Sequence, residues 1–361
     1  VSDLVCEYDP HLVCISVLGS TPSASSTPKM TVAKELIKSI NKTAPGTPII
    51  WQGIHPSALP ELTLRESGGD FVSRGEGFLN MAALLNKLIE KNENYDIPGI
   101  CYIKEGLFFS NNSDEVVSTD ELPMAAWDLL PIDKYKAHNW HCFDDIEKRQ
   151  PYIAIYTAYG CPFTCHYCNI HELYSLSNKP LMRYRSISSI IDEIDWLVTN
   201  HNVKNFKFAD ELFTTNKKHV INVCDALIER NYDLNIWTFV RPDPYPLDLL
   251  KKMRSAGFTW VAMGIESFVD TVRNGVNKKW GQKKLAETIQ RYNDAGINII
   301  ANFIFGLPDD TYETMNATLD MAMEYNFEYV DFYTCMAYPG SQLYLDSIKG
   351  GFDNNTWHSY S

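Results

Sequence analysis

The 361 residues predict an α/β fold in two parts, a partial Rossmann-like (flavodoxin-like) domain followed by a partial (β/α)6 TIM-like barrel. In the first ~90 residues short apolar runs alternate with amphipathic segments, which is typical of a parallel sheet wrapped by helices. A second series of the same kind starts at Tyr152 and contains six apolar runs. This length fits about two domains, so each part can bury its own core.

The first part is expected to alternate strands and helices. Its strands are predicted at Leu12–Leu18, Pro48–Trp51 and Asp70–Ser73, and its helices at Lys29–Thr43, Leu59–Ser67 and Phe78–Glu90. A doubly wound sheet normally has more strands than these. We therefore expect residues 1–93 to be a domain whose N-terminal piece precedes Val1.

Periodicity fades between residues 94 and 150. Ile100–Ile103 and Leu107–Ser110, joined through Lys104–Gly106, predict a hairpin. The remainder is predicted to be a linker in which Trp127 and Leu129 pack on a neighbouring element.

Histidines outside the second series have a structural interpretation. His138, His141 and Cys142 are interpreted as packing residues, because the spacing of a metal site is incomplete without further ligands; a second metal site is the alternative. His55 is interpreted as a structural cap or turn residue.

The second series predicts the barrel within residues 151–345, and residues 346–361 begin a C-terminal region that we expect to continue beyond Ser361. Strands are predicted at Tyr152–Thr157, Asn205–Ala209, Leu234–Phe239, Trp260–Gly264, Asn298–Phe305 and Tyr329–Thr334, and helices at Ile187–Asn200, Lys217–Arg230, Pro246–Ala256, Gln282–Ala295 and Tyr312–Tyr325. In such barrels the chemistry lies at the carboxyl ends of the strands.

Composition excludes several classes of protein. The net charge of −13 comes without a run of Lys or Arg, so the electrostatic footprint of a nucleic-acid binder is missing. No stretch approaches the roughly 18–20 apolar residues of a membrane span, and the first residues lack the pattern of a signal peptide. Nine cysteines are too sparse for a disulfide scaffold and fit reduced thiols with one metal site. We expect a cytoplasmic enzyme.

The cysteine loop follows the first strand of the second series. Residues 160–168 read GCPFTCHYC and contain Cys161, Cys165 and Cys168. Three thiolates on so short a loop can wrap one face of a cuboidal iron–sulfur cluster. A [4Fe-4S] cluster has four irons, so one iron is left open for a substrate or cofactor.

Two alternatives remain for the loop. Zinc would need a fourth ligand, for which His166 or His171 could be argued. An electron-transfer ferredoxin would normally supply a fourth cysteine.

The CxxxCxxC spacing, with the aromatic Tyr167 before the last cysteine, resembles the radical SAM superfamily. The resemblance implies that the amino and carboxylate groups of S-adenosylmethionine chelate the open iron. It also implies that an electron from an external donor, such as a flavodoxin or ferredoxin, enters the sulfonium and that a 5′-deoxyadenosyl radical or a cobalt-linked reaction follows. The protein positions the cofactors, which carry the difficult chemistry.

The same resemblance assigns the S-adenosylmethionine site to strand ends. The residues are Tyr167, then Asp210 and Glu211 for the methionine ammonium, Arg241 for the carboxylate, Glu266 and Ser267 for the ribose beside Gly264, and Gly306 near the adenine. The structural alternatives are a solvated acidic turn at Asp210–Glu211, a surface ion pair at Arg241, and strands followed by turns at the others.

Two features follow the sixth predicted strand. Tyr338–Ser341 is expected to be a tight turn that closes the barrel mouth. Cys335 is interpreted as a small buried hydrophobe, with a second thiol acting on the substrate as the alternative.

Three segments of the first part resemble the cobalamin-binding domain fused to a large radical SAM subgroup: residues 16–18 (SVL), 52–56 (QGIHP) and 74–77 (RGEG). The resemblance implies that the nucleotide tail of cobalamin is lined by Ser16, Leu18, Gly53, Gly75, Glu76 and Gly77, where glycines admit close approach. Gln52 departs from the glycine pair of the family, and the segment for the Asp-x-His-x-x-Gly signature would precede residue 1. A flavodoxin-like domain used only for packing is the competing interpretation.

The resemblance extends from Leu12 to about Leu345 and includes Asn139–Phe143, a stretch seen in a poorly characterised branch. It implies a cobalamin-dependent methyltransferase acting on an unactivated carbon of a small molecule, with no single side chain as an obvious acid or base. Aromatics such as Tyr333, Phe303 and Trp237 are expected to line the pocket. The alternatives are a radical SAM cyclase, mutase or oxidoreductase, and a non-catalytic cobalamin or iron–sulfur sensor.

Overall fold

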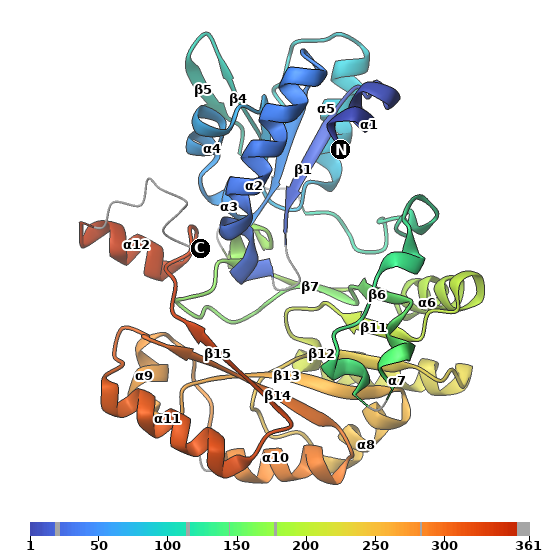
Figure 1. Ribbon diagram of the computed structural model, residues 1–361, viewed down its shortest axis with the longest axis vertical. Coiled ribbons are helices and arrows are strands. Elements are labelled where there is room, and N and C mark those ends of the chain that lie inside the picture. The colour runs from blue at the N-terminus through green and yellow to red at the C-terminus, as the bar shows by residue number, and fades with distance from the viewer. Residues whose placement is uncertain (19–21, 113–115, 144, 177–178, 282–283, 352–361) are drawn as a thin grey trace. The chain divides into compact units, whose positions relative to one another are not determined.

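The computed structural model describes residues 1–18, 22–112, 116–143, 145–176, 179–281 and 284–351 (Figure 1). The chain forms two compact units. The first comprises Val1–Val117, Gly160–Leu181 and the described part of Met336–Ser361, and the second comprises Ser118–Tyr159 and Met182–Cys335. The segment that carries the three loop cysteines thus belongs to the same unit as the N-terminal sheet.

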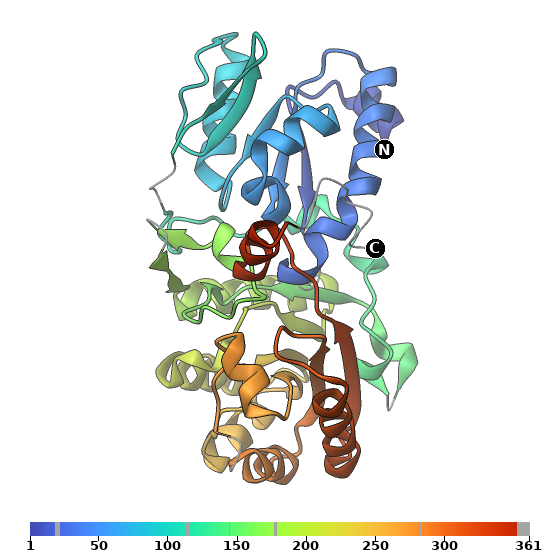
Figure 2. The ribbon, with the colours of Figure 1, turned by 90° about the vertical axis from the view of Figure 1, so that its left-hand side faces the viewer.

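The first unit contains a five-stranded sheet in the order β1-β2-β3-β4-β5. Strands β1 (Val13–Val17), β2 (Ile49–Gly53) and β3 (Phe71–Ser73) are parallel, and β4 (Ile100–Lys104) and β5 (Leu107–Ser110) are antiparallel. Figure 2 shows β4 and β5 as a hairpin. The sequence placed this hairpin in the linker, whereas its first strand pairs with β3 and extends the sheet.

Six helices of the described chain belong to the first unit. They are α1 (Ser2–Tyr8), α2 (Pro22–Thr43), α3 (Ile54–Ala58), α4 (Pro60–Ser67), α5 (Phe78–Ile89) and, near the end of the described chain, α12 (Gln342–Lys349). The short turn η5 (Ile170–Glu172) and the strands β8 (Ser175–Leu176) and β9 (Lys179–Pro180) complete the unit. Fully buried Ile37, Ile40, Ile49 and Trp51 form the centre of its core.

Helix bounds in this unit differ from the prediction at three points. Helix α2 begins seven residues earlier than expected, with Pro28 inside it. The helix predicted at Leu59–Ser67 is α4, and a separate short helix, α3, precedes it. Pro60 is the first residue of α4, a position where the missing N–H of proline is tolerated. Helix α1 was not predicted.

The second unit is built on a six-stranded, all-parallel sheet in the order β15-β14-β13-β12-β11-β6. Its strands are β6 (Tyr152–Ile155), β11 (Asn205–Phe208), β12 (Asn235–Val240), β13 (Phe258–Glu266), β14 (Asn298–Phe305) and β15 (Tyr329–Thr334). The chain also pairs β7 (Ala158–Gly160) with β10 (Met182–Tyr184). The predicted partial barrel of six strands is confirmed.

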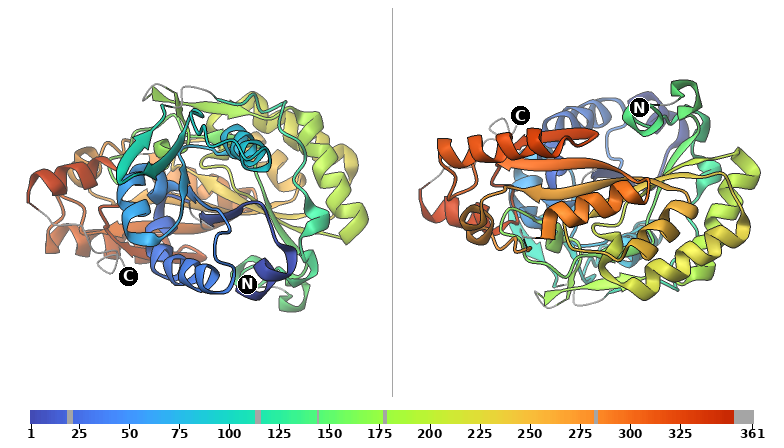
Figure 3. Two further views of the ribbon diagram at one scale, coloured as in Figure 1. Left: turned by 90° about the horizontal axis from the view of Figure 1, so that it is seen from above. Right: turned by 90° about the horizontal axis from the view of Figure 1, so that it is seen from below.

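Helices follow the strands of the second sheet and lie along its outer side (Figure 3). They are α6 (Ile187–His201), α7 (Lys217–Arg230), α8 (Leu247–Ser255), α9 (Asp270–Gly275), α10 (Leu285–Asp294) and α11 (Tyr312–Tyr325). Side chains of Ser186, Asn216 and Thr311 accept hydrogen bonds from first-turn amides and cap α6, α7 and α11. Phe206 and Phe208 of β11 point into this helix-covered core.

Of the two linker residues that were predicted to pack, one does so within the second unit. Trp127, in turn η1 (Trp127–Leu129), donates from Nε1 to Oε1 of Glu193 at 2.8 Å and packs on the helix-covered core. Leu129 at the end of the same turn is 78% exposed, so the prediction that it packs is wrong. A single 3-10 turn directs the two side chains to different sides.

The aromatic stretch of the linker also packs, as predicted. Trp140 lies 5.2 Å from Trp237 and 5.3 Å from Trp260 between ring centroids, and it stacks on His138 at 5.4 Å. His141 is buried, and burial lowers its pKa to about 3. These contacts agree with the packing interpretation of this stretch.

Candidate functional site

The loop that carries the three cysteines has a constrained start. Gly160 has a φ of +91°, and a Cβ there would lie 2.0 Å from the carbonyl oxygen of Leu181, so a side chain is excluded. A turn closes the loop, with Cys168 N–H donating to the Cys165 carbonyl at 3.0 Å. Cys161 is partly exposed, like the other two. The three thiols are therefore reachable from outside the core.

The thiols of the three loop cysteines are the type of ligand that an iron–sulfur cluster takes. All nine cysteines lie in the described ranges, and none is in a disulfide. Within those ranges the three loop cysteines do not converge as a metal site. Three thiolates on one short loop match the ligand type that clusters take, and their side chains have to turn toward a common point to hold one.

Contacts within the first unit fix the segment after the cysteines. Asn169 donates from Nδ2 to the Pro339 carbonyl at 2.9 Å, and Leu343 N–H donates to the His166 carbonyl at 2.9 Å. The predicted turn at Tyr338–Ser341 is present, because Ser341 N–H donates to the Tyr338 carbonyl at 3.0 Å. The cysteine segment and the chain before α12 are thus held to each other.

The same segment lies against the N-terminal sheet's connections. Turn η5 packs on α3, and the position of a Cβ on Gly75 is 3.7 Å from the Leu173 carbonyl oxygen. Burial raises the pKa of Glu172, and the positive charge of Arg74 opposes that rise. The residues after the third cysteine and the loop after β3 are therefore neighbours in one compact unit.

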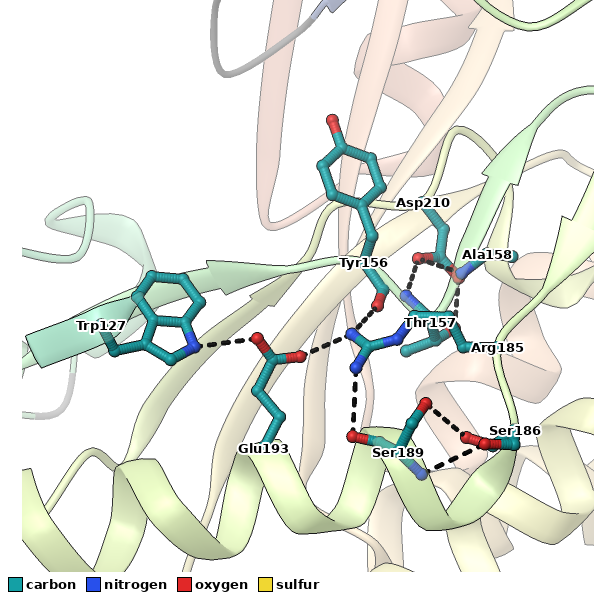
Figure 4. Close-up of polar contacts among 9 residues, drawn as sticks. All are labelled: Trp127, Tyr156, Thr157, Ala158, Arg185, Ser186, Ser189, Glu193 and Asp210. Atoms are coloured by element: carbon teal, nitrogen blue, oxygen red, sulfur yellow. Dashed lines mark hydrogen bonds and ion pairs between the residues drawn. The ribbon is translucent and has the colours of Figure 1, made fainter. Parts of the chain in front are cut away.

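Asp210 holds the chain that leads into the cysteine loop (Figure 4). Its Oδ1 accepts from the backbone N–H of Thr157 at 2.6 Å and of Ala158 at 3.1 Å, and its Oδ2 accepts from the Thr157 hydroxyl at 2.5 Å. His219 Nε2 lies 3.1 Å from the same hydroxyl. Burial raises the pKa of Asp210 to about 6 although these hydrogen bonds lower it. The solvated acidic turn is thus wrong for Asp210.

Glu211 has a different environment from its neighbour. Its Oε1 is buried and has no hydrogen-bond partner among the described residues. Burial raises the pKa of Glu211 to about 7, while the positive charge of Lys207 lowers it and the charge of Asp210 raises it. A buried carboxylate oxygen without a donor fits a ligand that brings an N–H, as the amino group of S-adenosylmethionine does.

Arg185 contacts the backbone of Tyr156, the residue before Thr157 (Figure 4). It donates to the Tyr156 carbonyl at 2.9 Å, to Glu193 Oε2 at 2.5 Å and to the Ser189 carbonyl at 3.0 Å. The sequence analysis missed Arg185, Glu193 and His219, because no short motif marks residues that act through the backbone of a distant segment.

Arg241 is buried, and it forms the ion pair that was the structural alternative, with the partly exposed Asp243. Its Nε donates to Asp243 at 3.2 Å and its Nη2 to the Lys279 carbonyl at 2.5 Å. These contacts fix the guanidinium at the end of β12.

Glu266 forms a buried ion pair that the sequence analysis missed. Lys278 Nζ lies 3.0 Å from Glu266 Oε1, and both side chains are buried. Glu266 has a φ of +70°, where the register of β13 on β14 shifts. A Cβ on Gly264 would lie 2.7 Å from that Oε1, so this glycine leaves room for the ion pair rather than for the ligand itself.

Ser267 and Gly306 shape the turns after their strands. Ser267 Oγ lies 3.2 Å from Thr318 Oγ1 and accepts from Val269 N–H. Gly306 has a φ of +84°, and its N–H donates to Asp310 Oδ2 at 3.0 Å. Phe303 is fully buried on the helix-facing side against Phe268, so it does not line a pocket as expected.

Polar side chains gather where β1, β2 and β3 end. Ser16 Oγ donates to Gln52 Oε1 at 2.8 Å, and Ser73 Oγ donates to Asn80 at 2.8 Å. A cavity of about 110 Å³ opens beside the loop after β3. Its lining includes Arg74, Glu76, Gly77, Asn80 and Pro98. These strand ends carry the polar groups and the space that part of a cofactor tail requires.

Gly53 has a packing role that the sequence analysis did not anticipate. Its φ is +130°, and a Cβ would lie 2.6 Å from the Val17 carbonyl oxygen. The absence of a side chain thus allows β2 to end against β1. Buried His55 is the second residue of α3, and its N–H donates to Ser26 Oγ at 3.0 Å while its Nδ1 lies 3.0 Å from Thr27 Oγ1.

Comparison with known families agrees with this arrangement. Residues 155–322 match the model of the Radical SAM superfamily, and residues 1–85 match that of the B12 binding domain. Together the two matches are those of the group of radical SAM proteins that also contain a B12 binding domain. The superfamily uses a [4Fe-4S] cluster and S-adenosylmethionine, and this group uses cobalamin.

Individual relatives cover nearly all of the chain. An uncharacterized methyltransferase of Pyrococcus horikoshii is 28% identical over 100% of this chain and 74% of its own length. The anaerobic magnesium-protoporphyrin IX monomethyl ester cyclase of Cereibacter sphaeroides is 29% identical over 94% of this chain. The chain spans 53% of that cyclase, about half its length.

Solved structures show the same fold. The radical S-adenosylmethionine methyltransferase TsrM of Kitasatospora setae, with cobalamin and a [4Fe-4S] cluster bound, has a TM-score of 0.77 at 18% identity. The match covers 97% of this chain and 67% of that one. Among the described helices, none combines the length and the apolar character that crossing a membrane requires.

Proposed function

We propose that the protein is a cobalamin-dependent radical SAM methyltransferase that methylates an unactivated carbon of a small molecule. One observation carries the proposal. The segment after the third cysteine packs on α3 and on the loop after β3, within the unit that contains the B12 binding domain. Methyl transfer through cobalamin requires the cluster-bound S-adenosylmethionine and the corrin to be neighbours.

The three cysteines hold the cluster in this proposal. When bound, the cluster and S-adenosylmethionine supply a carbon radical, and cobalamin supplies a transferable methyl group. The chain supplies three thiolates, Cys161, Cys165 and Cys168, on a loop whose start is fixed by Gly160. Asp210 acts as a positioning residue, because its two oxygens bind the backbone and the hydroxyl just before that loop.

Side chains at strand ends orient S-adenosylmethionine. Glu211 accepts a hydrogen bond from an N–H of the methionine amino group through its buried Oε1. The buried Arg241 faces the methionine carboxylate, and Glu266, with Ser267 beside it, accepts from the ribose hydroxyls. Tyr167 and Gly306 line the nucleotide. Burial excludes water and strengthens each of these polar contacts.

The first unit binds the nucleotide tail of cobalamin. Ser16 and Leu18 line it at the end of β1, and Gly75, Glu76 and Gly77 line it beside the cavity. Gly53 contributes indirectly, since it brings the ends of β1 and β2 together. An external donor such as a flavodoxin or ferredoxin supplies the electron, which places the enzyme in the reducing cytoplasm.

The test is anaerobic reconstitution of the full-length protein with iron and sulfide, followed by dithionite and S-adenosylmethionine with and without methylcobalamin. We expect 5′-deoxyadenosine by mass spectrometry from the wild type and none from Cys165→Ala, whose iron content falls. Cys6→Ala is the matched control, because Cys6 is exposed in α1, outside the cysteine loop. It retains both iron and cleavage.

Two outcomes contradict the proposal. A cluster-loaded protein that binds cobalamin but never cleaves S-adenosylmethionine is a sensor. Cleavage that yields 5′-deoxyadenosine and no S-adenosylhomocysteine, in an extract that contains the substrate, supports a cyclase, mutase or oxidoreductase instead. Because the chain is 29% identical in sequence to the magnesium-protoporphyrin IX monomethyl ester cyclase, a cyclase is the second candidate.

A further inference from the structure

A cavity of about 610 Å³ opens at the end of the N-terminal sheet to which no function has been assigned. It lies at the amino ends of the parallel strands, because Pro48 directly precedes β2 and Asp70 directly precedes β3. Helices α2 and α4 end beside it, with Gly46 after α2 and Gly68 after α4. The residues assigned to the cobalamin tail lie at the carboxyl ends of the same strands, so the two sites are at opposite ends of the sheet.

Three aromatic residues that line the cavity pack on one another. Phe71 and Tyr102 are register partners on β3 and β4, so their side chains lie on the same face of the sheet. The ring centroid of Tyr95 lies 4.9 Å from that of Phe71 and 5.6 Å from that of Tyr102, both in edge-to-face geometry. Asn111 Nδ2 donates to the Tyr95 carbonyl at 2.9 Å and holds that residue in place. Tyr95 and Tyr102 are only partly buried, so their rings also offer surface to the cavity.

Charged side chains of the lining leave a surplus of negative charge. Lys104 Nζ lies 3.5 Å from Glu93 Oε2, so these two charges offset each other. Asp70 has no cationic partner among the described residues, and its Oδ2 accepts from Ile49 N–H at 2.8 Å. Burial raises the pKa of Tyr95, and the negative charges of Glu93 and Asp70 raise it further. Both carboxylates are therefore within electrostatic reach of this ring.

Backbone partial charges at this end of the sheet have the same sign. The carboxyl end of a helix carries about half a negative elementary charge, from carbonyls without an intrahelical partner. Helix α2 ends at Thr43 and α4 at Ser67, close in the chain to the lining residues Thr47 and Gly69. An anion in the cavity would meet the negative ends of both helices, whereas a cation is attracted by them and by the faces of aromatic rings.

We propose that this cavity binds a small organic cation, an ammonium compound with an apolar body. Asp70 supplies the opposite charge, and the rings of Phe71, Tyr95 and Tyr102 supply apolar contact and cation–π attraction. Sites for small molecules have volumes of roughly 300–1,000 Å³, mostly aromatic or apolar linings and a few polar groups, and this cavity has all three properties. The site goes beyond the proposed methyl transfer, since it uses none of the residues assigned to the cluster, to S-adenosylmethionine or to cobalamin.

The test is equilibrium dialysis of radiolabelled choline against the full-length, cluster-loaded protein with cobalamin bound. Unlabelled competitors are choline itself, its neutral carbon isostere dimethylbutanol and the anion dimethylbutanoate. We expect saturable binding of one choline per chain with a millimolar or lower Kd. Unlabelled choline displaces the label, and neither the neutral nor the anionic competitor does so at the same concentration, because attraction to the carboxylate and to ring faces requires the positive charge.

Charge variants of exposed residues locate the bound choline. Asp70→Asn keeps a carbonyl oxygen for Ile49 N–H and removes the charge, so choline affinity should fall about fivefold or more. Lys104→Met leaves the Glu93 carboxylate unpaired, so affinity should rise about threefold or more. Asp96→Asn is the matched control, because Asp96 is exposed and does not line the cavity, and its affinity should stay within about twofold of wild type. A general loss of structure cannot produce shifts in both directions.

A further variant tests the aromatic contribution. Tyr95→Leu removes a ring and keeps an apolar side chain, and we expect choline to bind about threefold or more weakly. Circular dichroism compares its folding with that of the wild type. Where this variant does not fold, the opposite shifts of Asp70→Asn and Lys104→Met decide the proposal.

Four results overturn the inference. Absence of saturable choline binding by the wild type shows that the cavity is not a site for organic cations, and equal displacement by dimethylbutanol shows that the charge is not recognised. Equal affinities of Asp70→Asn and Asp96→Asn show that choline binds elsewhere. Displacement of choline by millimolar Mg²⁺ at constant ionic strength shows a metal site instead. None of these measurements depends on cleavage of S-adenosylmethionine, so failure here is distinguishable from failure of the proposed function.

Discussion

Asp210 and Thr157 are joined twice, since the carboxylate accepts from both the N–H and the hydroxyl of Thr157, at 2.6 and 2.5 Å. Thr157 lies four residues before Cys161 along the chain. A carboxylate assigned from the sequence to the cofactor thus has both of its oxygens engaged by the chain that leads into the cysteine loop. Its neighbour Glu211 is the carboxylate with a buried oxygen to offer.

Asp210→Asn is expected to destabilise the protein by about 1–3 kcal/mol, because a neutral amide replaces the charged acceptor of the hydrogen bonds from Thr157 and Ala158. Thermal unfolding of the purified protein measures this, together with its iron and sulfide content after reconstitution. Asp233→Asn, at an exposed site, is the control and stays within about 0.5 kcal/mol of wild type. Equal stability and iron content in the two variants would mean that Asp210 does not hold the loop.

Affinity for S-adenosylmethionine is expected to depend on pH through Glu211. Burial raises the pKa of this carboxyl to about 7, and its ionised form is the stronger acceptor for the amino N–H of S-adenosylmethionine. Affinity of the wild type therefore rises as pH increases through about 7. Glu211→Gln binds about tenfold or more weakly at pH 8, consistent with the loss of a charged hydrogen bond, and loses the pH dependence.

Equilibrium dialysis of the cluster-loaded protein between pH 6 and 8.5 follows this dependence. The exposed Glu229 of α7 supplies the matched variant Glu229→Gln, which should retain the wild-type curve. Stability moves in the opposite direction to affinity. The pKa of Glu211 is higher in the folded state, about 7, than in the unfolded chain, 4.5. The protonated carboxyl therefore stabilises the folded state fully below pH 4.5, and this stabilisation is lost as pH rises through about 7. A flat binding curve in the wild type would remove Glu211 from the site.

Gly53→Ala is expected to cost at least about 2 kcal/mol of stability in the first unit, because the backbone there is strained for any side chain and the new Cβ meets the Val17 carbonyl. Gly46→Ala is a demanding control. Gly46 also has a positive φ, +89°, but nothing lies within 4 Å of its Cβ position, so it bears only the backbone cost of about 1 kcal/mol. Denaturant unfolding compares the two, and equal losses would refute a steric role for Gly53.

Lys278→Met is expected to destabilise the second unit by about 3–5 kcal/mol, because it leaves the buried carboxylate of Glu266 without its partner. Adding Glu266→Gln in the same chain recovers part of this loss, since it removes the unpaired charge. Thermal unfolding of the four proteins in this double-mutant cycle gives the coupling energy. Additive losses would show that the two groups do not interact.

The comparison between sequence and structure is clearest along the strands. Asn298–Phe305 and Tyr329–Thr334 were predicted with the bounds that the structure has. The first is a largely buried strand whose apolar run is nearly continuous, and the second is the exposed edge strand beside it. Hairpin residues were also found, but not their place in the sheet. Pairing of β4 with β3 is a long-range choice that neither strand's own pattern encodes.

The sequence by itself determined the chemistry of this protein. Three cysteines at fixed spacing specify their ligand type locally, because a short loop keeps the thiols within reach of one cluster whatever surrounds it. The strand ends with Asp210, Glu211, Arg241 and Glu266 could likewise be located from the apolar runs before them.

Only the tertiary structure decided what each polar group at those ends faces. Asp210 is engaged by Thr157 and Glu266 by Lys278, whereas Glu211 keeps a buried oxygen without a donor. The ammonium of Lys207 lies between Trp237 and Phe239 for the same reason. Burial and partners come from segments far apart in the chain, so two carboxylates one position apart, Asp210 and Glu211, acquire different pKa values and different roles.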